Sequence, residues 1–137
     1  MQSQIKKIDL NKTSFSIDAK NPFESFTYLR AMEKSNSASE KSGWIADHLG
    51  EIKNETLISF MPLYKKFNSY GEFVFDHQWA HAFQRSGRNY YPKLLTAIPF
   101  TPCEGDRILA KSKIDKLRLV DACIKKIKTE RIESWHI

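Results

Sequence analysis

The sequence predicts an α/β domain built on a twisted, mixed but mostly antiparallel sheet flanked by about three helices. Two observations predict this class. Apolar segments of strand length alternate with well-capped helix starts along the chain. The stretch 90–128 in particular reads as a strand, a loop with one glycine and a capped basic helix. The 137 residues suit a single domain, residues 1–137, large enough to bury roughly 65–70% of its unfolded surface.

The first elements are a weak strand and a strongly signalled helix. Residues 4–10 are predicted as a strand, although lysines weaken the pattern. The helix over residues 22–34 begins with Asn21 as N-cap, Pro22 in the first helical position and Glu24 completing a capping box. Its apolar side chains recur at helical spacing, at Phe23, Phe26, Leu29 and Met32.

The middle of the chain predicts paired strands and a second helix. Residues 44–53 and 55–64 are expected to pair around a turn at Lys53 and Asn54, and the apolar run 56–61 indicates a central strand. After a turn at 68–71 and the apolar run 73–75, Asp76 is expected to cap a helix that ends at Gly87. We expect core positions at Trp44, Trp79, Ala80, Phe83 and the other phenylalanines.

A strand, a helix and a final strand complete the prediction. Residues 91–100 form the strand, and Ser112 and Asp115 make a capping box for the helix that follows. Residues 131–137 are expected to be a last strand of the sheet. The apolar positions of the last helix are Ile114, Leu117, Val120, Ile124 and Ile127.

The positive charge of the chain is concentrated near its end. The net charge is +6, and residues 107–137 hold nine Lys or Arg against four Asp or Glu. One interpretation is a solvated outer helix face, and the other is attraction of an anionic cofactor or nucleic acid. Aromatic residues do not interleave with this basic segment, which argues against a stacking platform for single-stranded nucleic acid.

Cysteine and histidine usage points to a cytoplasmic protein without a metal centre. Cys103 and Cys123 have no metal-ligand spacing, and no secretory leader or membrane span is evident, so both thiols are expected to be reduced. His77 and His81 lie four residues apart on one helix, but no metalloprotease glutamate stands between them. We therefore expect no metal.

The loop before the last helix is a candidate anion site. A strand that delivers a loop onto a helix N-terminus presents backbone N–H groups and the positive end of the helix dipole. Thr101, Gly105, Arg107 and Ser112 are the residues expected to bind a phosphorylated small molecule, with Arg107 supplying a charged hydrogen bond. The alternative is a structural turn that leaves Arg107 on the surface.

Acid–base and substrate candidates lie near the middle of the chain. Glu72 follows a turn and precedes an apolar run, where burial would raise its pKa toward that of a base for amine deprotonation. An ordinary salt bridge is the alternative for Glu72, and a helix cap is the alternative for Asp76 as base. Ligands tend to gather at strand ends, and the residues at the predicted strand ends are Tyr64, Lys66, Tyr90, Tyr91 and Lys93. We expect Tyr91 to be catalytic together with Glu72. We expect Tyr64 and Lys93 to contact the substrate.

The sequence resembles the FemAB-like family, known for peptidoglycan biosynthesis or recognition, within the GNAT-type N-acyltransferase superfamily. The matching runs occur in order and at family spacing. They are residues 21–23, 32–37, 43–44, 48–49, 62–64, 71–76, 79–80, 90–95 and 99–102, followed by Gly105 and Arg107. The chain departs from the family at Asn68, where a histidine is usual, and has Gly105 alone where the superfamily has a double-glycine loop.

This resemblance implies a GNAT-like half-fold and transfer of an acyl or aminoacyl group from coenzyme A or aminoacyl-tRNA to an amine. The loop at 101–107 would then bind the carrier's pyrophosphate. Family members are longer, so the chain resembles their N-terminal part, and an apolar strand at its end would favour a homodimer built at that strand or the last helix. The alternatives are a non-catalytic binding or assembly module of the same fold, or a basic nucleic-acid-binding domain.

Overall fold

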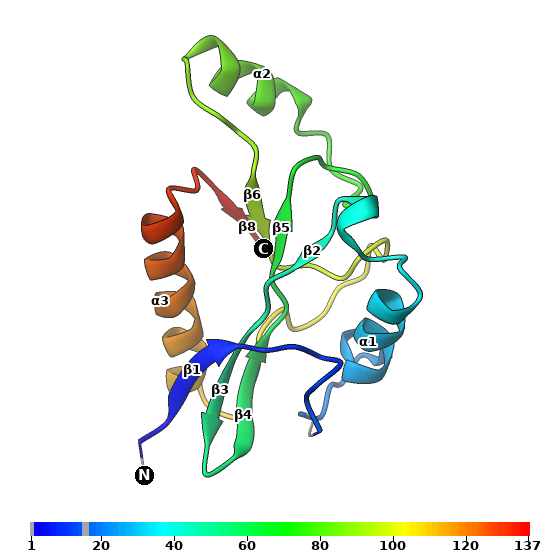
Figure 1. The fold of residues 1–137 in the computed structure, drawn as a ribbon, viewed down its shortest axis with the longest axis vertical. Helices are drawn as coiled ribbons and strands as arrows, with labels where there is room; N and C mark the ends of the chain where they lie inside the picture. Colours follow the sequence, from blue (N-terminus) through cyan, green and yellow to red (C-terminus); the bar gives the residue numbers. More distant parts are fainter. Residues whose placement is uncertain (1, 15–16) are drawn as a thin grey trace.

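The computed structural model describes residues 2–14 and 17–137. Two four-stranded sheets form the centre, with strand orders β1-β3-β4-β7 and β2-β5-β6-β8 (Figure 1). All neighbouring strands are antiparallel except the parallel pair β6 and β8. The strands are β1 (Gln4–Lys7), β2 (Ile45–Ala46), β3 (Leu49–Lys53), β4 (Thr56–Met61), β5 (Tyr64–Lys66), β6 (Lys93–Leu95), β7 (Leu109–Ala110) and β8 (Trp135–His136). The helices are α1 (Phe26–Lys34), α2 (His77–Arg85) and α3 (Lys113–Glu130), with short 3-10 turns at Pro22–Glu24 and Glu40–Ser42. The predicted α/β class with three helices is confirmed.

One long, bent hairpin links the two sheets. Each of its two predicted strands is broken once, so that β3 and β4 lie in the first sheet while β2 and β5 lie in the second. The backbone N–H of Asp47 donates to the Leu63 carbonyl at 2.8 Å and keeps the arms paired across the break. At the tip, Asn54 and Glu55 both have positive φ, 48° and 61°, as a tight two-residue hairpin turn requires.

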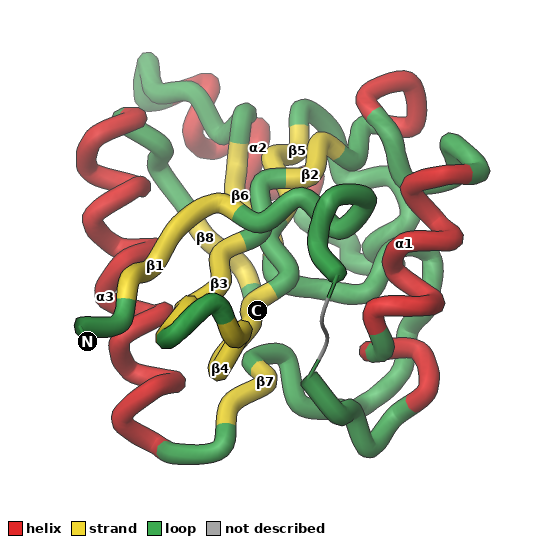
Figure 2. Tube along the Cα trace, turned by 60° about the horizontal axis from the view of Figure 1, so that its bottom comes forward, coloured by secondary structure: helices red, strands yellow, loops and turns green. Residues whose placement is uncertain are grey.

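Helices α1 and α3 lie on opposite sides of the sheets, as the ribbon view and the tube view both show (Figures 1 and 2). Phe26 and Leu29 of α1 pack with Phe60 of β4 in one core cluster. Leu119 and Cys123 of α3 pack with strand residues of both sheets in another. The expected apolar stripe of α3 was wrong for three of its five positions, because Ile114, Leu117 and Ile124 are exposed, whereas Ile127 packs against the core. Apolar residues occur around the whole helix, so the sequence period alone did not identify the buried face.

The helix starts agree with the sequence in part. Ser112 accepts a hydrogen bond from the Asp115 N–H at 3.1 Å, which confirms that cap. Asn21 caps only the 3-10 turn, and Ser25 caps α1 by accepting from the Tyr28 N–H at 3.2 Å. The expected capping box through Glu24 was wrong, because this side chain is buried beside Arg107 instead.

The segment between β5 and β6 differs most from the prediction. Phe73, Phe75 and Trp79 are exposed rather than core, and no residue of α2 is buried. In Figure 1, α2 projects beyond the sheets instead of packing on them. The strand predicted over 91–100 is limited to Lys93–Leu95. Helical periodicity correctly identified α2 but did not reveal that this chain leaves its apolar face uncovered.

The C-terminal segment packs on its own chain. Residues 131–137 were expected to be a strand, and β8 pairs with β6 as the edge of the second sheet. Ile132 is buried, and the indole N–H of Trp135 donates to the Thr96 hydroxyl at 2.9 Å. The chain itself therefore covers Ile132 and part of Trp135, whereas Ile137 is exposed.

Candidate functional site

Two fully buried lysines lie side by side on the second sheet. Lys66 of β5 and Lys93 of β6 are directly opposite each other in the antiparallel register. Their strand neighbours Lys65 and Leu94 point to the other face, where Leu94 joins the cluster under α3. Because side chains alternate along a strand, the register places both ammonium groups on the face away from α3. The segment between β5 and β6 covers them.

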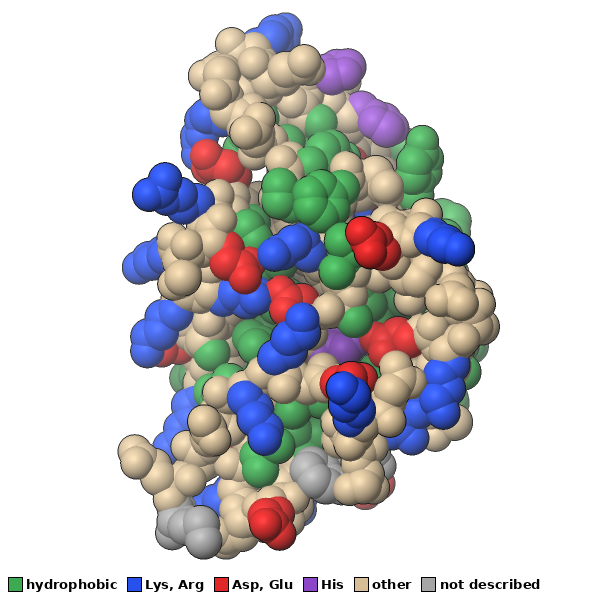
Figure 3. Space-filling model, in the orientation of Figure 1, with side chains coloured by type: hydrophobic (Ala, Val, Ile, Leu, Met, Phe, Trp, Pro, Cys, Tyr) green, Lys and Arg blue, Asp and Glu red, His purple; other side chains and the backbone are tan. Residues whose placement is uncertain are grey.

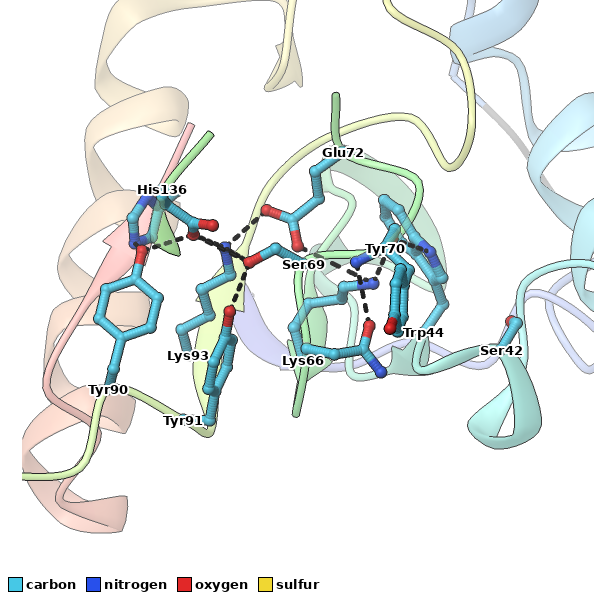
Figure 4. Close-up of polar contacts among 12 residues, drawn as sticks. Ser42, Trp44, Lys66, Ser69, Tyr70, Glu72, Tyr90, Tyr91, Lys93 and His136 are labelled. Atoms are coloured by element: carbon cyan, nitrogen blue, oxygen red, sulfur yellow. Dashed lines mark hydrogen bonds and ion pairs between the residues drawn. The ribbon is translucent and has the colours of Figure 1, made fainter. Parts of the chain in front are cut away.

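Lys93 is the centre of the resulting polar cluster (Figure 4). Its ammonium group donates to Glu72 Oε1 and Asp76 Oδ2, both at 2.7 Å, and to the Ser69 hydroxyl at 3.0 Å. The Glu72 and Asp76 side chains are 2% and 9% exposed. A buried charge is tolerated only when it is paired and hydrogen-bonded, and Lys93 meets both conditions.

Lys66 has a looser environment. Its ammonium group donates to the Tyr70 carbonyl at 2.9 Å, lies 3.9 Å from the ring centre of Trp44, and is 3.9 Å from Glu72 Oε2. The pKa of Lys66 is lowered to about 8, because burial and the neighbouring Lys93 together outweigh the opposing effect of Glu72. This amine therefore changes charge close to neutral pH.

Asp76 serves this cluster rather than a helix cap. It precedes α2, but its side chain makes no capping hydrogen bond. Its Oδ2 accepts instead from Lys93, from the Ser69 hydroxyl at 2.9 Å and from the Tyr90 hydroxyl at 2.7 Å. Burial alone would raise the pKa of Asp76, but these hydrogen bonds lower it to about 2, so this carboxylate stays ionised. The expected cap was wrong.

Glu72 is the carboxylate with the more basic character. Burial raises its pKa, and the ion pair with Lys93 opposes this only in part. Its Oε2 is buried and makes no hydrogen bond within the described part of the chain. The loop that carries Glu72 is not the apolar strand end expected from the sequence; the carboxylate is buried because the loop folds back over β5 and β6.

A hydrogen-bonded path joins Glu72 to the protein surface. Glu72 contacts Lys93, Lys93 contacts Ser69, and the Ser69 hydroxyl lies 2.7 Å from that of Tyr91 (Figure 4). Tyr91 is half-buried and lines a groove of about 470 Å³ between α2 and residues 88–91. Such an arrangement can move a proton between the groove and a buried carboxylate.

The remaining expected site residues lie elsewhere. Tyr64 is on β5 beneath Trp44 and packs edge-on against Trp44 and His48. The Thr101 hydroxyl lies 2.9 Å from that of Tyr28, and the Ser112 hydroxyl donates to the Asp115 carboxylate at 2.7 Å. The structure therefore brings together Glu72, Tyr91 and Lys93, but not the loop at 101–112.

Arg107 and Gly105 both meet Glu24. Arg107 Nη1 lies 3.6 Å from Glu24 Oε1, and Nη2 donates to the Cys103 carbonyl. A side chain at Gly105 would overlap the Glu24 carboxylate, since an added Cβ would lie 2.1 Å from Glu24 Oε1. Both residues thus have a structural account, and their assignment to a phosphorylated ligand stays a prediction.

Sequence reasoning missed Ser69 and underrated Asp76 and Lys66. The alternation along each strand could have indicated that both lysines are buried. Lys66 lies on the same strand face as Tyr64, and Lys93 lies on the same face as Leu95. A lysine that shares a face with large apolar side chains is unlike an ordinary surface lysine. Ser69 carried no such signal, because only the fold of its loop brings it to Lys93 and Tyr91.

Residues 2–14 and 17–137 contain neither a candidate metal cluster nor a candidate membrane-spanning helix. No group of three or more His, Cys, Asp or Glu residues in this part of the chain could hold a metal ion. No helix there is long and apolar enough to cross a membrane.

Comparison with known proteins identifies a family. The model of the FemAB-like family, described as peptidoglycan biosynthesis/recognition, matches residues 3–137. No curated protein and no solved structure matches the chain. The polar cluster around Lys93 takes most of its members from two of the runs that resemble the family, residues 71–76 and 90–95. Since the family match extends over nearly every residue, the chain belongs to the FemAB-like family.

Proposed function

We propose that the chain is a transferase domain of peptidoglycan biosynthesis that moves an acyl or aminoacyl group from a carrier to an amine acceptor. The family description supports the pathway and a relation to aminoacyl transferases. The observation that carries the chemistry is the buried Glu72, linked through Lys93 and Ser69 to Tyr91 on the wall of a groove. The GNAT-type fold and a coenzyme A thioester or aminoacyl-tRNA as donor are parts of this proposal.

The reaction requires deprotonation of the acceptor. The amine nitrogen bonds to the acyl carbon, the carrier's sulfur or oxygen departs with a proton, and the amine gives up a proton in turn. Glu72 is the proposed base, because its raised pKa and free Oε2 suit it better than Asp76, which is held ionised by three hydrogen bonds. Tyr91 and Ser69 would relay the proton to Lys93, which would give one of its own protons to Glu72 as it takes one from Ser69.

The carrier's phosphates are assigned to residues 101–112, as the sequence predicted. Arg107 Nη1 is buried 3.6 Å from Glu24 Oε1 and makes no hydrogen bond in the described residues. The Ser112 hydroxyl and the Asp115 carboxylate already occupy the start of α3. This part of the proposal therefore depends on Arg107 more than on the helix N-terminus.

The direct test is an acylation assay with the purified chain. The acceptor is a peptidoglycan peptide with a free lysine amine, the donors are acetyl-coenzyme A and alanyl-tRNA in separate reactions, and the product is followed by mass spectrometry. Glu72→Gln should lower kcat roughly 100-fold or more with little change in KM, as expected for loss of a general base. No product with either donor from the unmodified chain would refute the proposal.

A second candidate is a non-catalytic assembly module, and the exposed aromatic surface favours it. Phe67, Tyr70, Phe73, Phe75 and Trp79 are all more than half exposed. Aromatic side chains gathered on one segment of a soluble protein mark an interaction site. In this role the chain would form a homodimer.

A further inference from the structure

The segment between β5 and β6 is attached to the rest of the domain mainly by polar contacts. Of residues 67–89, all of which the structure describes, Asp76 is the only one that is buried as a whole. The apolar side chains of this segment face solvent instead, and Phe75 is 95% exposed. Figure 3 shows hydrophobic side chains exposed at the end of the molecule that carries α2. The apolar burial that fixes α1 and α3 on the sheets therefore contributes little here.

Both ends of this segment join the second sheet at the same place. Lys66 is the last residue of β5 and Lys93 is the first residue of β6. The two residues lie opposite each other in the antiparallel register. A segment that leaves and re-enters a sheet at paired positions can move away without separating the strands. We call residues 67–89 the lid, because they cover both lysines.

Lys93 holds the lid closed through side chains. Its ammonium group binds the Ser69 hydroxyl at 3.0 Å and the carboxylates of Glu72 and Asp76 at 2.7 Å. All three partners belong to the lid, and Figure 4 shows Ser69 and Glu72 beside Lys93. The strongest attachment of the lid is therefore a set of charged hydrogen bonds to one residue of the sheet.

Two carbonyl groups of the lid make the remaining hydrogen bonds to the domain beneath. The Tyr70 carbonyl accepts from the Trp44 indole N–H at 3.0 Å and from the Lys66 ammonium at 2.9 Å. The Gly71 carbonyl accepts from the Phe100 N–H at 3.1 Å. Each such bond contributes only about 1 kcal/mol net, because water replaces it when the groups separate.

The charge of Lys66 opposes closure of the lid. Its side chain is fully buried, yet the nearest carboxylate oxygen, Glu72 Oε2, is 3.9 Å away, which is too far for a hydrogen bond. The charged groups that face it are Glu72 from the lid and Lys93 from β6, and Trp44 contributes an aromatic ring. A buried ammonium group that is incompletely paired is more stable in water, which favours the open position.

We propose that residues 67–89 open as a unit, held closed by Lys93 and biased toward opening by the buried charge of Lys66. Opening would expose Glu72 and Lys93 together, because the lid carries the first and covers the second. A ligand would then reach the polar cluster directly. The lid would open in the same way whether or not the chain catalyses the transfer reaction.

The direction of the pH dependence follows from the position of Lys66. In the closed form, burial and Lys93 lower the pKa of Lys66 from 10.5 to about 8, and in the open form water restores the ordinary value. Protons therefore bind more tightly to the open form, so opening is favoured at neutral pH and becomes rarer as the pH rises above about 8. The equilibrium constant for opening should fall roughly tenfold between about pH 7 and about pH 9.

The test is hydrogen exchange of the full chain, followed by NMR across this pH range. The reporters are the Trp44 indole N–H and the Phe100 amide N–H, because both donate to carbonyls of the lid. The comparison is the Trp135 indole N–H, which donates to Thr96 outside the lid. We expect the two reporters to share one opening free energy, smaller than that of Trp135. Their exchange rates, corrected for intrinsic exchange, should fall roughly tenfold as the pH rises.

Two variants test whether Lys66 causes the pH dependence. Lys66→Met removes the charge, so opening should no longer depend on pH over this range. Lys65→Met, on the opposite face of β5 beside Glu130, should keep the dependence. The measurement on the unmodified chain remains decisive even if Lys66→Met does not fold.

Three outcomes would overturn the proposal. Exchange of Trp44 and Phe100 only at the free energy of Trp135 would show that the lid does not open separately. Opening that is independent of pH in the unmodified chain would remove the role of Lys66, and so would a pH dependence that persists in Lys66→Met.

Discussion

Replacing Lys93 by methionine should destabilise the protein strongly, because it leaves two carboxylates buried without their main partner. Among the described residues, Lys93 alone contacts both Glu72 and Asp76, each at 2.7 Å. Methionine fills a similar volume but removes the charge. Lys66 remains, yet it lies 3.9 Å from Glu72 and makes neither an ion pair nor a hydrogen bond with Asp76.

The magnitude follows from this geometry. Removing one member of a buried ion pair typically costs about 3–5 kcal/mol. For a chain of this size, that corresponds to a fall in melting temperature of roughly 10–20 °C. Part of the cost is visible in Asp76 alone: lowering its pKa from 3.8 to about 2 corresponds to about 2 kcal/mol of stability.

The cost should depend on pH in a defined direction. In the unmodified chain the stability from Asp76 is present above pH 3.8 and is lost as the pH falls toward about 2. In Lys93→Met both carboxylates lack their main partner, so their pKa values should rise and they should take up protons at higher pH. The difference in unfolding free energy between the two proteins should thus be smaller in mild acid than at neutral pH.

Urea unfolding at neutral pH and in mild acid, followed by circular dichroism, measures this. Lys65→Met is the matched control, since Lys65 lies one residue from Lys66 on β5 but pairs with Glu130 on the opposite, more exposed face. It should cost less than about 1 kcal/mol. Adding Glu72→Gln to Lys93→Met should recover part of the loss. A cost of Lys93→Met no larger than the control, or one independent of pH, would refute the reasoning.

Three other outcomes follow from the structure. If the loop at 101–112 binds the phosphates of coenzyme A, Arg107→Ala should weaken coenzyme A binding in a thermal-shift titration. Lys128→Ala, at the far end of α3, should not weaken it. Equal changes in melting temperature for the two variants would remove Arg107 from that site. Binding to duplex DNA or RNA should be weak and should fall steeply as the salt concentration rises. The reason is that four basic residues of α3 are already paired with carboxylates: Lys116, Arg118, Lys125 and Lys126. Submicromolar, sequence-selective binding at physiological salt would contradict this. Light scattering at micromolar concentration should give a dimer, and replacing Phe75 and Trp79 by serine should shift it to monomer; a monomer in the unmodified chain would exclude the assembly role.

The local signals in the sequence were sufficient for most elements of the fold. The Ser112 and Asp115 cap, the hairpin turn and the apolar run of β4 depend on contacts between near neighbours, so the sequence carries them directly. The turn lies at Asn54 and Glu55, one residue beyond the predicted Lys53 and Asn54. Trp44 was also expected in the core, and it is fully buried. The exposed face of α2 and the buried face of α3 depend on what packs against each helix, and periodicity does not contain that information.

For the candidate site, the sequence by itself determined the residue types and the tertiary structure decided which of them meet. Glu72, Tyr91 and Lys93 were identified from the sequence, but Ser69, which connects them, becomes significant only when its loop folds over β5 and β6. Lys66 and Lys93 are 27 residues apart in the chain and become neighbours through the antiparallel register. The physical reason is that burial and pairing of charge are properties of the folded surroundings, so the same lysine is an ordinary surface residue in one fold and the centre of a buried cluster in this one.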